Sequence, residues 1–171
     1  YNQAFNSTNE LLLDTTEGQD AEAAYSVRQL SSTATECMII RRASDSKLRT
    51  IGFKDRDIDE AAIESFCKGT TCTVQTWKDQ SGNGNDATAA ASTNEPTIYT
   101  GGALVKIDGK VAMTLDGSND GFDITTITGG QYGIFTVGKP SSLVGYYTDS
   151  TTGSRQYILR NTTSYTVAGS F

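Results

Sequence analysis

Short apolar runs alternate with turn residues along most of this chain. The clearest runs are 37–40, 73–77 and the alternating Val111, Met113 and Leu115, and Gly, Asn, Asp and Ser residues stand between them. Thr (25), Ser (16) and Gly (17) are abundant among the 171 residues, and such a chain favours β-branched strands and turns over long helices. We therefore predict a mainly β fold of the sandwich or jelly-roll kind.

The individual elements follow from local patterns. A hairpin is expected over 36–53, and a second one over 103–115, where Asp108-Gly109 suits a type I′ turn and the Val111 face is buried. The best helix spans 59–68, because Asp57 or Asp59 can cap it and Gly69 ends it. A shorter helix is expected over 21–30. Further strands are expected at 122–127, 132–138, 155–160 and 164–168.

Several classes of function are excluded by composition. The chain has no His, which removes Ser-His-Asp and Cys-His catalysis and zinc sites built on imidazole. A formal net charge of −6 argues against a nucleic-acid partner. No apolar run approaches the roughly 18 residues of a membrane helix. We expect residues 1–20 to form an N-terminal arm and 21–171 a β-sandwich domain, in a piece of something longer, since the chain starts at Tyr1.

Two loops rich in Asp, Asn and Gly invite a calcium interpretation. Residues 79–84 and 116–121 match the first half of an EF-hand loop, but their twelfth positions are Ala90 and Ile127 instead of Glu. We favour structural turns, in which Asp79, Asn83 and Asn85 accept backbone N–H groups. No metal or other cofactor is therefore expected. The proposed structural turn consists of Asp79, Gln80, Ser81, Gly82, Asn83, Gly84 and Asn85.

The cysteines and aromatic residues leave alternatives open. Cys67 and Cys72 could close a disulfide or remain two reduced thiols, and Cys37 is expected to be a buried apolar residue. Aromatic side chains among Asn, Asp and Thr can form sugar-binding surfaces, although core packing is the simpler interpretation for any one of them. The candidates are Trp77, Tyr132, Tyr146, Tyr147, Tyr157 and Tyr165.

One stretch resembles a known family. The segments FCKGTTC at 66–72 and WKDQSGNGN at 77–85 resemble the catalytic domain of the fungal α-L-arabinofuranosidase B family, and AYSVR at 24–28 and RRASD at 41–45 are similar to its N-terminal segment. The resemblance implies a concanavalin A-like jelly-roll sandwich, to which the local patterns add one or two short helices near the N-terminus. It also implies a Cys67–Cys72 disulfide.

The same motifs, with LDGSND at 115–120 and YNQAFN at 1–6, look closer still to lectin-like domains in structural proteins of marine tailed phages. This resemblance implies a virion protein of the capsid or tail, such as a decoration module. Its expected partners are other virion subunits, with homo-oligomer formation, and host-surface glycan. The tentative glycan-binding residues are Trp77, Tyr132, Gln156 and Tyr157.

The catalytic residues of the enzymes carry over poorly. Their nucleophilic Glu falls at Gln156 in the best match, GSRQYILRN at 153–161, and an amide cannot attack an anomeric carbon. We therefore expect a non-catalytic protein located in a virion. The alternatives are an arabinofuranosidase-like glycoside hydrolase domain and a secreted carbohydrate-binding module.

Overall fold

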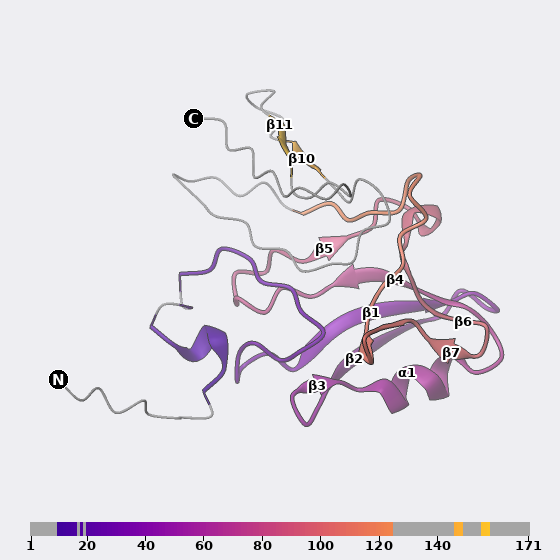
Figure 1. Ribbon diagram of the computed structural model, residues 1–171, viewed down its shortest axis with the longest axis horizontal. Coiled ribbons are helices and arrows are strands. Elements are labelled where there is room, and N and C mark those ends of the chain that lie inside the picture. Colours follow the sequence, from indigo (N-terminus) through magenta and orange to yellow (C-terminus); the bar gives the residue numbers. More distant parts are fainter. Residues whose placement is uncertain (1–9, 17, 19, 125–145, 149–154, 158–171) are drawn as a thin grey trace. The chain divides into compact units, whose positions relative to one another are not determined.

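The computed structural model describes residues 10–16, 18, 20–124, 146–148 and 155–157 (Figure 1). The chain divides into two compact units, Tyr1–Ile127 and Thr128–Phe171. No helix in these described ranges is long and apolar enough to cross a membrane. The elements, in chain order, are η1 (Leu12–Asp14), β1 (Glu36–Arg42), β2 (Leu48–Lys54), β3 (Asp57–Ile58), α1 (Glu60–Cys67), β4 (Cys72–Trp77), β5 (Ala87–Thr88), η2 (Ser92–Asn94), β6 (Thr97–Thr100), β7 (Ala103–Leu104), β8 (Lys106–Ile107), β9 (Lys110–Val111), β10 (Tyr146–Thr148) and β11 (Arg155–Tyr157).

The first unit is built on one antiparallel sheet. Its strands lie in the order β3-β2-β1-β4-β6-β7, and β5 pairs with the end of β4. β1 lies at the centre, where Ile40 is opposite Arg49 of β2 and Val74 of β4. The ladder is irregular between Ile39 and Ile40, as expected of a β-bulge, which increases local twist. The mainly β class is confirmed, and the antiparallel sheet is consistent with the predicted jelly-roll sandwich.

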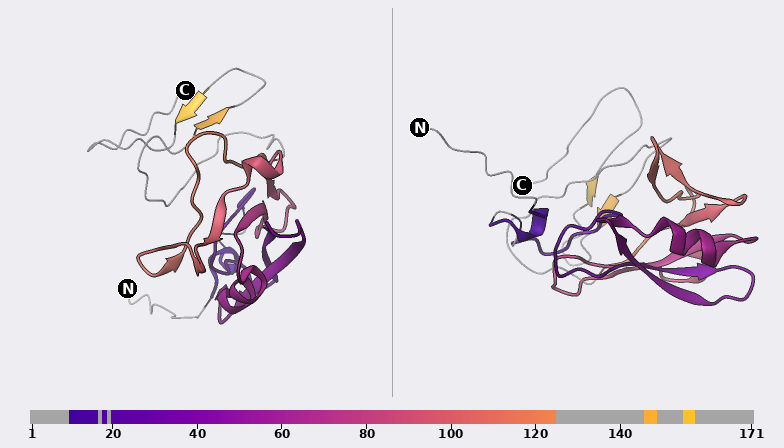
Figure 2. Two further views of the ribbon diagram at one scale, coloured as in Figure 1. Left: turned by 90° about the vertical axis from the view of Figure 1, so that its right-hand side faces the viewer. Right: turned by 90° about the horizontal axis from the view of Figure 1, so that it is seen from below.

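Helix α1 packs against this sheet near β2, β6 and β7 (Figures 1 and 2). Its N-cap is Asp59, whose side chain accepts a hydrogen bond from the N–H of Ala62 at 3.0 Å. Ile63 and Cys67, four positions apart and therefore on one face, are fully buried. The helix ends just before Gly69, so the prediction of a helix over 59–68 is confirmed.

The core forms where the sheet meets the helix. Its fully buried members are Cys37, Met38, Ile40, Ile51, Ile63, Cys67, Cys72, Val74, Pro96 and Ile98. Six of these come from β1, β2 and β4, as the predicted hairpin over 36–53 and strand after 72 require. The sequence pattern of short apolar runs therefore located most of the core.

Three predictions need correction. Residues 21–30 form no helix, because their backbone groups are satisfied by β3 and by the loop after β4. The second hairpin is shorter than predicted: β8 and β9 pair around Asp108 and Gly109, both with positive φ, whereas β7 pairs with β6. Leu115 is 46% exposed, so its predicted burial is wrong.

The remaining predicted strands are covered only in part. Asp123 forms an isolated bridge to Thr88, and residues 122–124 form no strand. In the second unit, Arg155–Tyr157 is a strand that pairs antiparallel with Tyr146–Thr148. The strands predicted at 132–138 and 164–168 lie outside the described residues.

Candidate functional site

The Asp79 carboxylate is the centre of the loop between β4 and β5. Its Oδ1 accepts hydrogen bonds from the N–H groups of Ala24 (2.9 Å) and Ser81 (2.9 Å). Its Oδ2 accepts from the Ser81 hydroxyl (2.7 Å) and the N–H of Asn85 (3.0 Å). Both oxygens are thus used inside the protein. The carboxylate fixes the turn and ties it to residue 24, which lies far away in the sequence.

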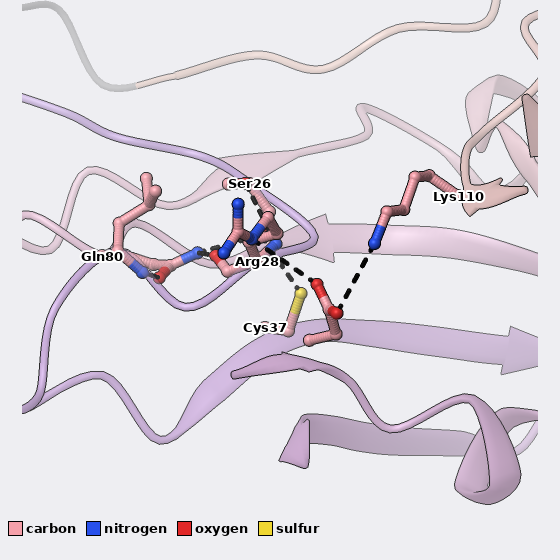
Figure 3. A network of polar contacts seen from close by, with 7 residues as sticks. Ser26, Arg28, Cys37, Gln80 and Lys110 are labelled. Atoms are coloured by element: carbon pink, nitrogen blue, oxygen red, sulfur yellow. Dashed lines mark hydrogen bonds and ion pairs between the residues drawn. The ribbon is translucent and has the colours of Figure 1, made fainter. Parts of the chain in front are cut away.

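Gln80 is the buried member of the same loop, with only 2% of its surface exposed. Its Oε1 accepts from the N–H of Leu30 at 2.7 Å, and its Nε2 donates to the carbonyls of Ser26 (2.9 Å) and Arg28 (3.0 Å) (Figure 3). The Gln80 N–H donates to the carbonyl of Ala24 at 2.8 Å. This side chain supplies the hydrogen bonds that a helix over 21–30 would have made internally, which explains why that predicted helix is absent.

The two asparagines of the loop act in the opposite sense from the prediction. The Asn83 amide donates to the carbonyls of Ala21 (3.0 Å) and Glu22 (3.2 Å), and the Asn85 amide donates to that of Glu22 (2.7 Å). They are donors because the segment they face is an irregular one whose carbonyls point at the loop. We call residues 79–86, with the segment 21–30 that they hold, the clamp.

Further hydrogen bonds within the clamp and beside it come from charged and phenolic groups. Lys78 Nζ lies 2.5 Å from Asp86 Oδ2, and this hydrogen bond raises the pKa of Lys78. Asp86 Oδ1 also accepts from the N–H of Asp79 at 2.9 Å. The Tyr25 hydroxyl donates to the carbonyl of Asn85. Burial, together with the negative charges of Asp79 and Asp86, raises the pKa of Tyr25 to about 12.

Trp77, a predicted glycan-binding residue, packs among aromatic rings next to the clamp. Its ring centroid lies 5.8 Å from that of Tyr25 and 6.3 Å from that of Phe122, both in tilted geometry. Its Nε1 is buried, and no hydrogen-bond partner is found for it in the described structure. These contacts show packing, and the glycan-binding role of Trp77 stays a prediction.

The second Asp/Gly loop, at 116–121, closes on itself. Asp116 Oδ1 accepts from the N–H groups of Ser118 (2.8 Å), Asn119 (3.1 Å) and Asp120 (3.2 Å), and these bonds lower the pKa of Asp116. The loop is attached to η2, where the Asn94 amide donates to the carbonyl of Asn119 at 2.7 Å. Within the described residues, no group of three or more Cys, Asp or Glu side chains could hold a metal ion.

An ion pair with a buried carboxylate joins β1 to the segment just before β6, and it has no counterpart in the sequence predictions. Arg41 Nε lies 2.9 Å and 3.1 Å from the two carboxylate oxygens of Glu95, whose side chain is 1% exposed. The Thr73 hydroxyl donates to Glu95 Oε2 at 2.5 Å. A buried carboxylate needs such partners to offset its lost hydration. No local pattern could have revealed the pair, because its members are 54 residues apart.

The cysteines lie in and beside the core. Cys67 and Cys72 are both fully buried and form the disulfide that the family resemblance implies, joining the end of α1 to the start of β4. Cys37 is free, and its Sγ–H donates to the carbonyl of Ser26 at 3.4 Å. Burial raises the pKa of the Cys37 thiol to about 12, so the nucleophilic thiolate is disfavoured.

The other predicted site residues belong to the second unit. Gln156 pairs with Tyr147, and Tyr157 with Tyr146, in the β10–β11 ladder. Tyr132 and Tyr165 lie outside the described residues. The structure therefore brings Trp77 to the clamp and places Gln156 and Tyr157 on β11, and the glycan-binding roles of Gln156, Tyr157 and Tyr132 stay predictions.

Solved structures with a partial likeness are arabinofuranosidases. A GH54 α-L-arabinofuranosidase soaked with a cyclic sulfate inhibitor is 31% identical, with a TM-score of 0.42, over 48% of this chain and 21% of that one. An arabinofuranosidase complexed with arabinofuranosyl-α-1,2-xylobiose is also 31% identical, with a TM-score of 0.43, over 55% and 22%. The chain thus spans about a fifth of their length. The comparison with curated proteins finds no match.

The family model for "Alpha-L-arabinofuranosidase B, catalytic" matches residues 14–168, which is most of the chain. This match overturns the prediction of a non-catalytic capsid or tail protein, and the virion localisation with it, because the matched family is one of glycosidases. The motifs at 66–85 are fold markers that say nothing of activity, so they do not distinguish this family from lectin-like phage proteins. The chain belongs to the family of α-L-arabinofuranosidase B catalytic domains.

Proposed function

We propose that this chain is part of a glycoside hydrolase that removes α-L-arabinofuranosyl groups from a polysaccharide. The observation that carries the proposal is the family match over residues 14–168. Hydrolysis of this kind works with two carboxyl groups and needs no cofactor. A buried disulfide suits a secreted enzyme, since disulfides persist in oxidising compartments.

The clamp has a structural part in this proposal. Asp79 and Asp86 lie in one loop, but each of their oxygens accepts a hydrogen bond within the protein. A general acid or a nucleophile needs a carboxyl group that can reach the glycosidic bond. We therefore assign the reacting carboxyl groups to other parts of the enzyme, and to the clamp the task of joining the N-terminal segment to the sheet.

The proposal is tested by the release of 4-nitrophenol from 4-nitrophenyl α-L-arabinofuranoside by the full-length protein. We expect turnover of this arabinofuranoside. We expect no turnover of 4-nitrophenyl β-D-xylopyranoside, a control that has the same leaving group and a different sugar. Absence of turnover on the arabinofuranoside and on arabinan, by protein shown to be folded by circular dichroism, would overturn the proposal.

The predicted position of Gln156 can be examined in the same assay. A neutral amide cannot form a glycosyl ester, so the nucleophile must be a carboxylate elsewhere if the protein is active. We expect Gln156→Ala to retain turnover. If Gln156→Ala abolishes turnover while Tyr147→Phe, a change at its strand partner, does not, Gln156 takes part in substrate binding or catalysis.

A further inference from the structure

The clamp contains the one Asn-Gly pair of the 171-residue sequence, Asn83-Gly84. Both residues are exposed. Gly84 has a φ of +77°, a conformation that side-chain-bearing residues rarely adopt, and a Cβ there would meet no atom within 4 Å. The backbone on the C-terminal side of Asn83 is therefore sterically open.

The Gly84 N–H is also free of a hydrogen bond in the described structure, whereas its neighbours are held. The N–H of Asn83 donates to the Ser81 hydroxyl at 3.3 Å, and that of Asn85 donates to Asp79 at 3.0 Å. The Gly84 nitrogen thus has no acceptor to give up before it can react. An exposed side-chain amide followed by a glycine nitrogen without an acceptor favours intramolecular cyclisation of asparagine, once the amide leaves the carbonyls of Ala21 and Glu22.

We propose that Asn83 is a site of spontaneous deamidation that loosens the clamp. The Gly84 nitrogen attacks Cγ of Asn83 and forms a C–N bond, the Cγ–Nδ2 bond breaks, and ammonia leaves with the proton from Gly84. Water then opens the resulting succinimide. Attack at Cγ gives aspartate, and attack at the Asn83 backbone carbonyl carbon gives isoaspartate. Nothing is oxidised or reduced, and water is the only co-reactant.

The consequence for the clamp follows from the contacts of the amide. Asn83 Nδ2 now donates to the carbonyls of Ala21 and Glu22 at 3.0 and 3.2 Å. A carboxylate in its place is an acceptor only and would face two carbonyl oxygens. It would also add a negative charge to a loop that already carries Asp79 and Asp86. The product is therefore expected to release residues 21–22 from the loop.

The experiment is a peptide map of the full chain by mass spectrometry during incubation at neutral to mildly alkaline pH. We expect deamidation at Asn83 to be faster than at Asn85, Asn94 or Asn119, none of which precedes Gly. An Asn83→Gln variant should lose the fast product and keep the amide. Deamidation of another asparagine before Asn83, or an intact Asn83 at the end, would overturn the proposal.

A second measurement tests whether deamidation loosens the clamp, and it does not depend on the deamidation rate. Asn83→Asp reproduces the aspartate product, and Asn119→Asp makes the same charge change in the other Asp/Gly loop. We expect Asn83→Asp to increase hydrogen exchange at the Ala24 and Leu30 amides severalfold, and Asn119→Asp to leave it unchanged. Equal exchange in the two variants would mean that the amide contacts of Asn83 do not hold the segment.

Discussion

At the loop after β4, Asp79 accepts a hydrogen bond from Ala24, 55 residues away, whereas Asp116 in the second Asp/Gly loop accepts from N–H groups two to four residues further on. The two loops begin alike, with Asp-Gln-Ser-Gly-Asn-Gly in one and Asp-Gly-Ser-Asn-Asp-Gly in the other. Their second positions differ, and Gln80 is buried where Gly117 has no side chain. The loops thus share a turn pattern, but only Gln80 supplies a polar side chain that enters the core.

The comparison explains how a loop can determine the path of a distant segment. Local capping by a carboxylate satisfies the turn itself, and both loops do this. The clamp also satisfies part-buried backbone groups of 24–30, which would otherwise lack partners within the protein. The energetic importance of such a loop therefore depends on the distance in sequence over which its bonds reach.

The largest expected difference between the loops is in Asp79→Ala against Asp116→Ala. Asp79→Ala removes four hydrogen bonds and leaves part-buried N–H groups of Ala24 and Asn85 without partners. We expect it to lower the free energy of unfolding by about 1–3 kcal/mol. Asp116→Ala leaves the N–H groups of Ser118, Asn119 and Asp120 to bind water. It should lower the free energy of unfolding by less than about 1 kcal/mol.

Urea unfolding of both variants, followed by tryptophan fluorescence, measures the two values. Trp77 is the only tryptophan and lies beside the clamp, so its signal reports on that region. Equal losses of stability in the two variants would contradict the distinction between a long-range and a local loop.

A second, somewhat smaller effect is expected at the position where the loops differ. Gln80→Gly gives the clamp the residue found at 117 and strands the N–H of Leu30 and the carbonyls of Ser26 and Arg28. The expected cost is about 1–2 kcal/mol. Gln80→Glu is the matched control, because it keeps the acceptor for Leu30 but loses both donors. A Gln80→Gly protein as stable as the wild type would refute the role assigned to this side chain.

These contacts also show what the sequence could and could not predict. The hairpin at 36–53, the capped helix and strand β4 follow from periodicity and caps, which are local. The absence of a helix over 21–30 does not follow from local patterns, because backbone groups of this segment are satisfied by Gln80, fifty residues away. The donor role of Asn83 and the Arg41–Glu95 pair could not be predicted for the same reason, because their partners are distant in the sequence. Asp79 was recognisable as a turn residue, but no spacing rule indicates that it reaches Ala24.

A third, still smaller effect concerns pH. Tyr25 donates to Asn85, and its pKa is raised from 10.0 to about 12, so the folded protein holds this proton more tightly than the unfolded chain. Its stabilisation is therefore complete below pH 10 and is lost as the pH rises from 10 towards 12. We expect Tyr25→Phe to reduce this alkaline decline in stability. The comparison is made in protein that carries Cys37→Ala, because the raised pKa of Cys37 acts in the same direction.

The measurement is the urea midpoint at a series of alkaline pH values. A decline of unchanged slope in the Tyr25→Phe, Cys37→Ala protein would show that the clamp does not control this titration. The loop at 116–121 should contribute nothing here, because the shifted groups in it are Asp116 and Asp120, whose ordinary pKa is 3.8.

The smallest effect, no change at all, is expected from calcium. Calcium takes six to eight oxygen ligands, with several carboxylates among them. The Asp79 oxygens accept four hydrogen bonds, and Asp116 Oδ1 accepts three, so these oxygens already bind N–H and O–H groups of the protein. Binding of the ion would have to break these bonds. The melting temperature should therefore be the same in excess calcium and in excess chelator. A fall of several degrees with chelator, absent in Asp79→Ala, would make the clamp a metal site, and one absent in Asp116→Ala would make the second loop the site.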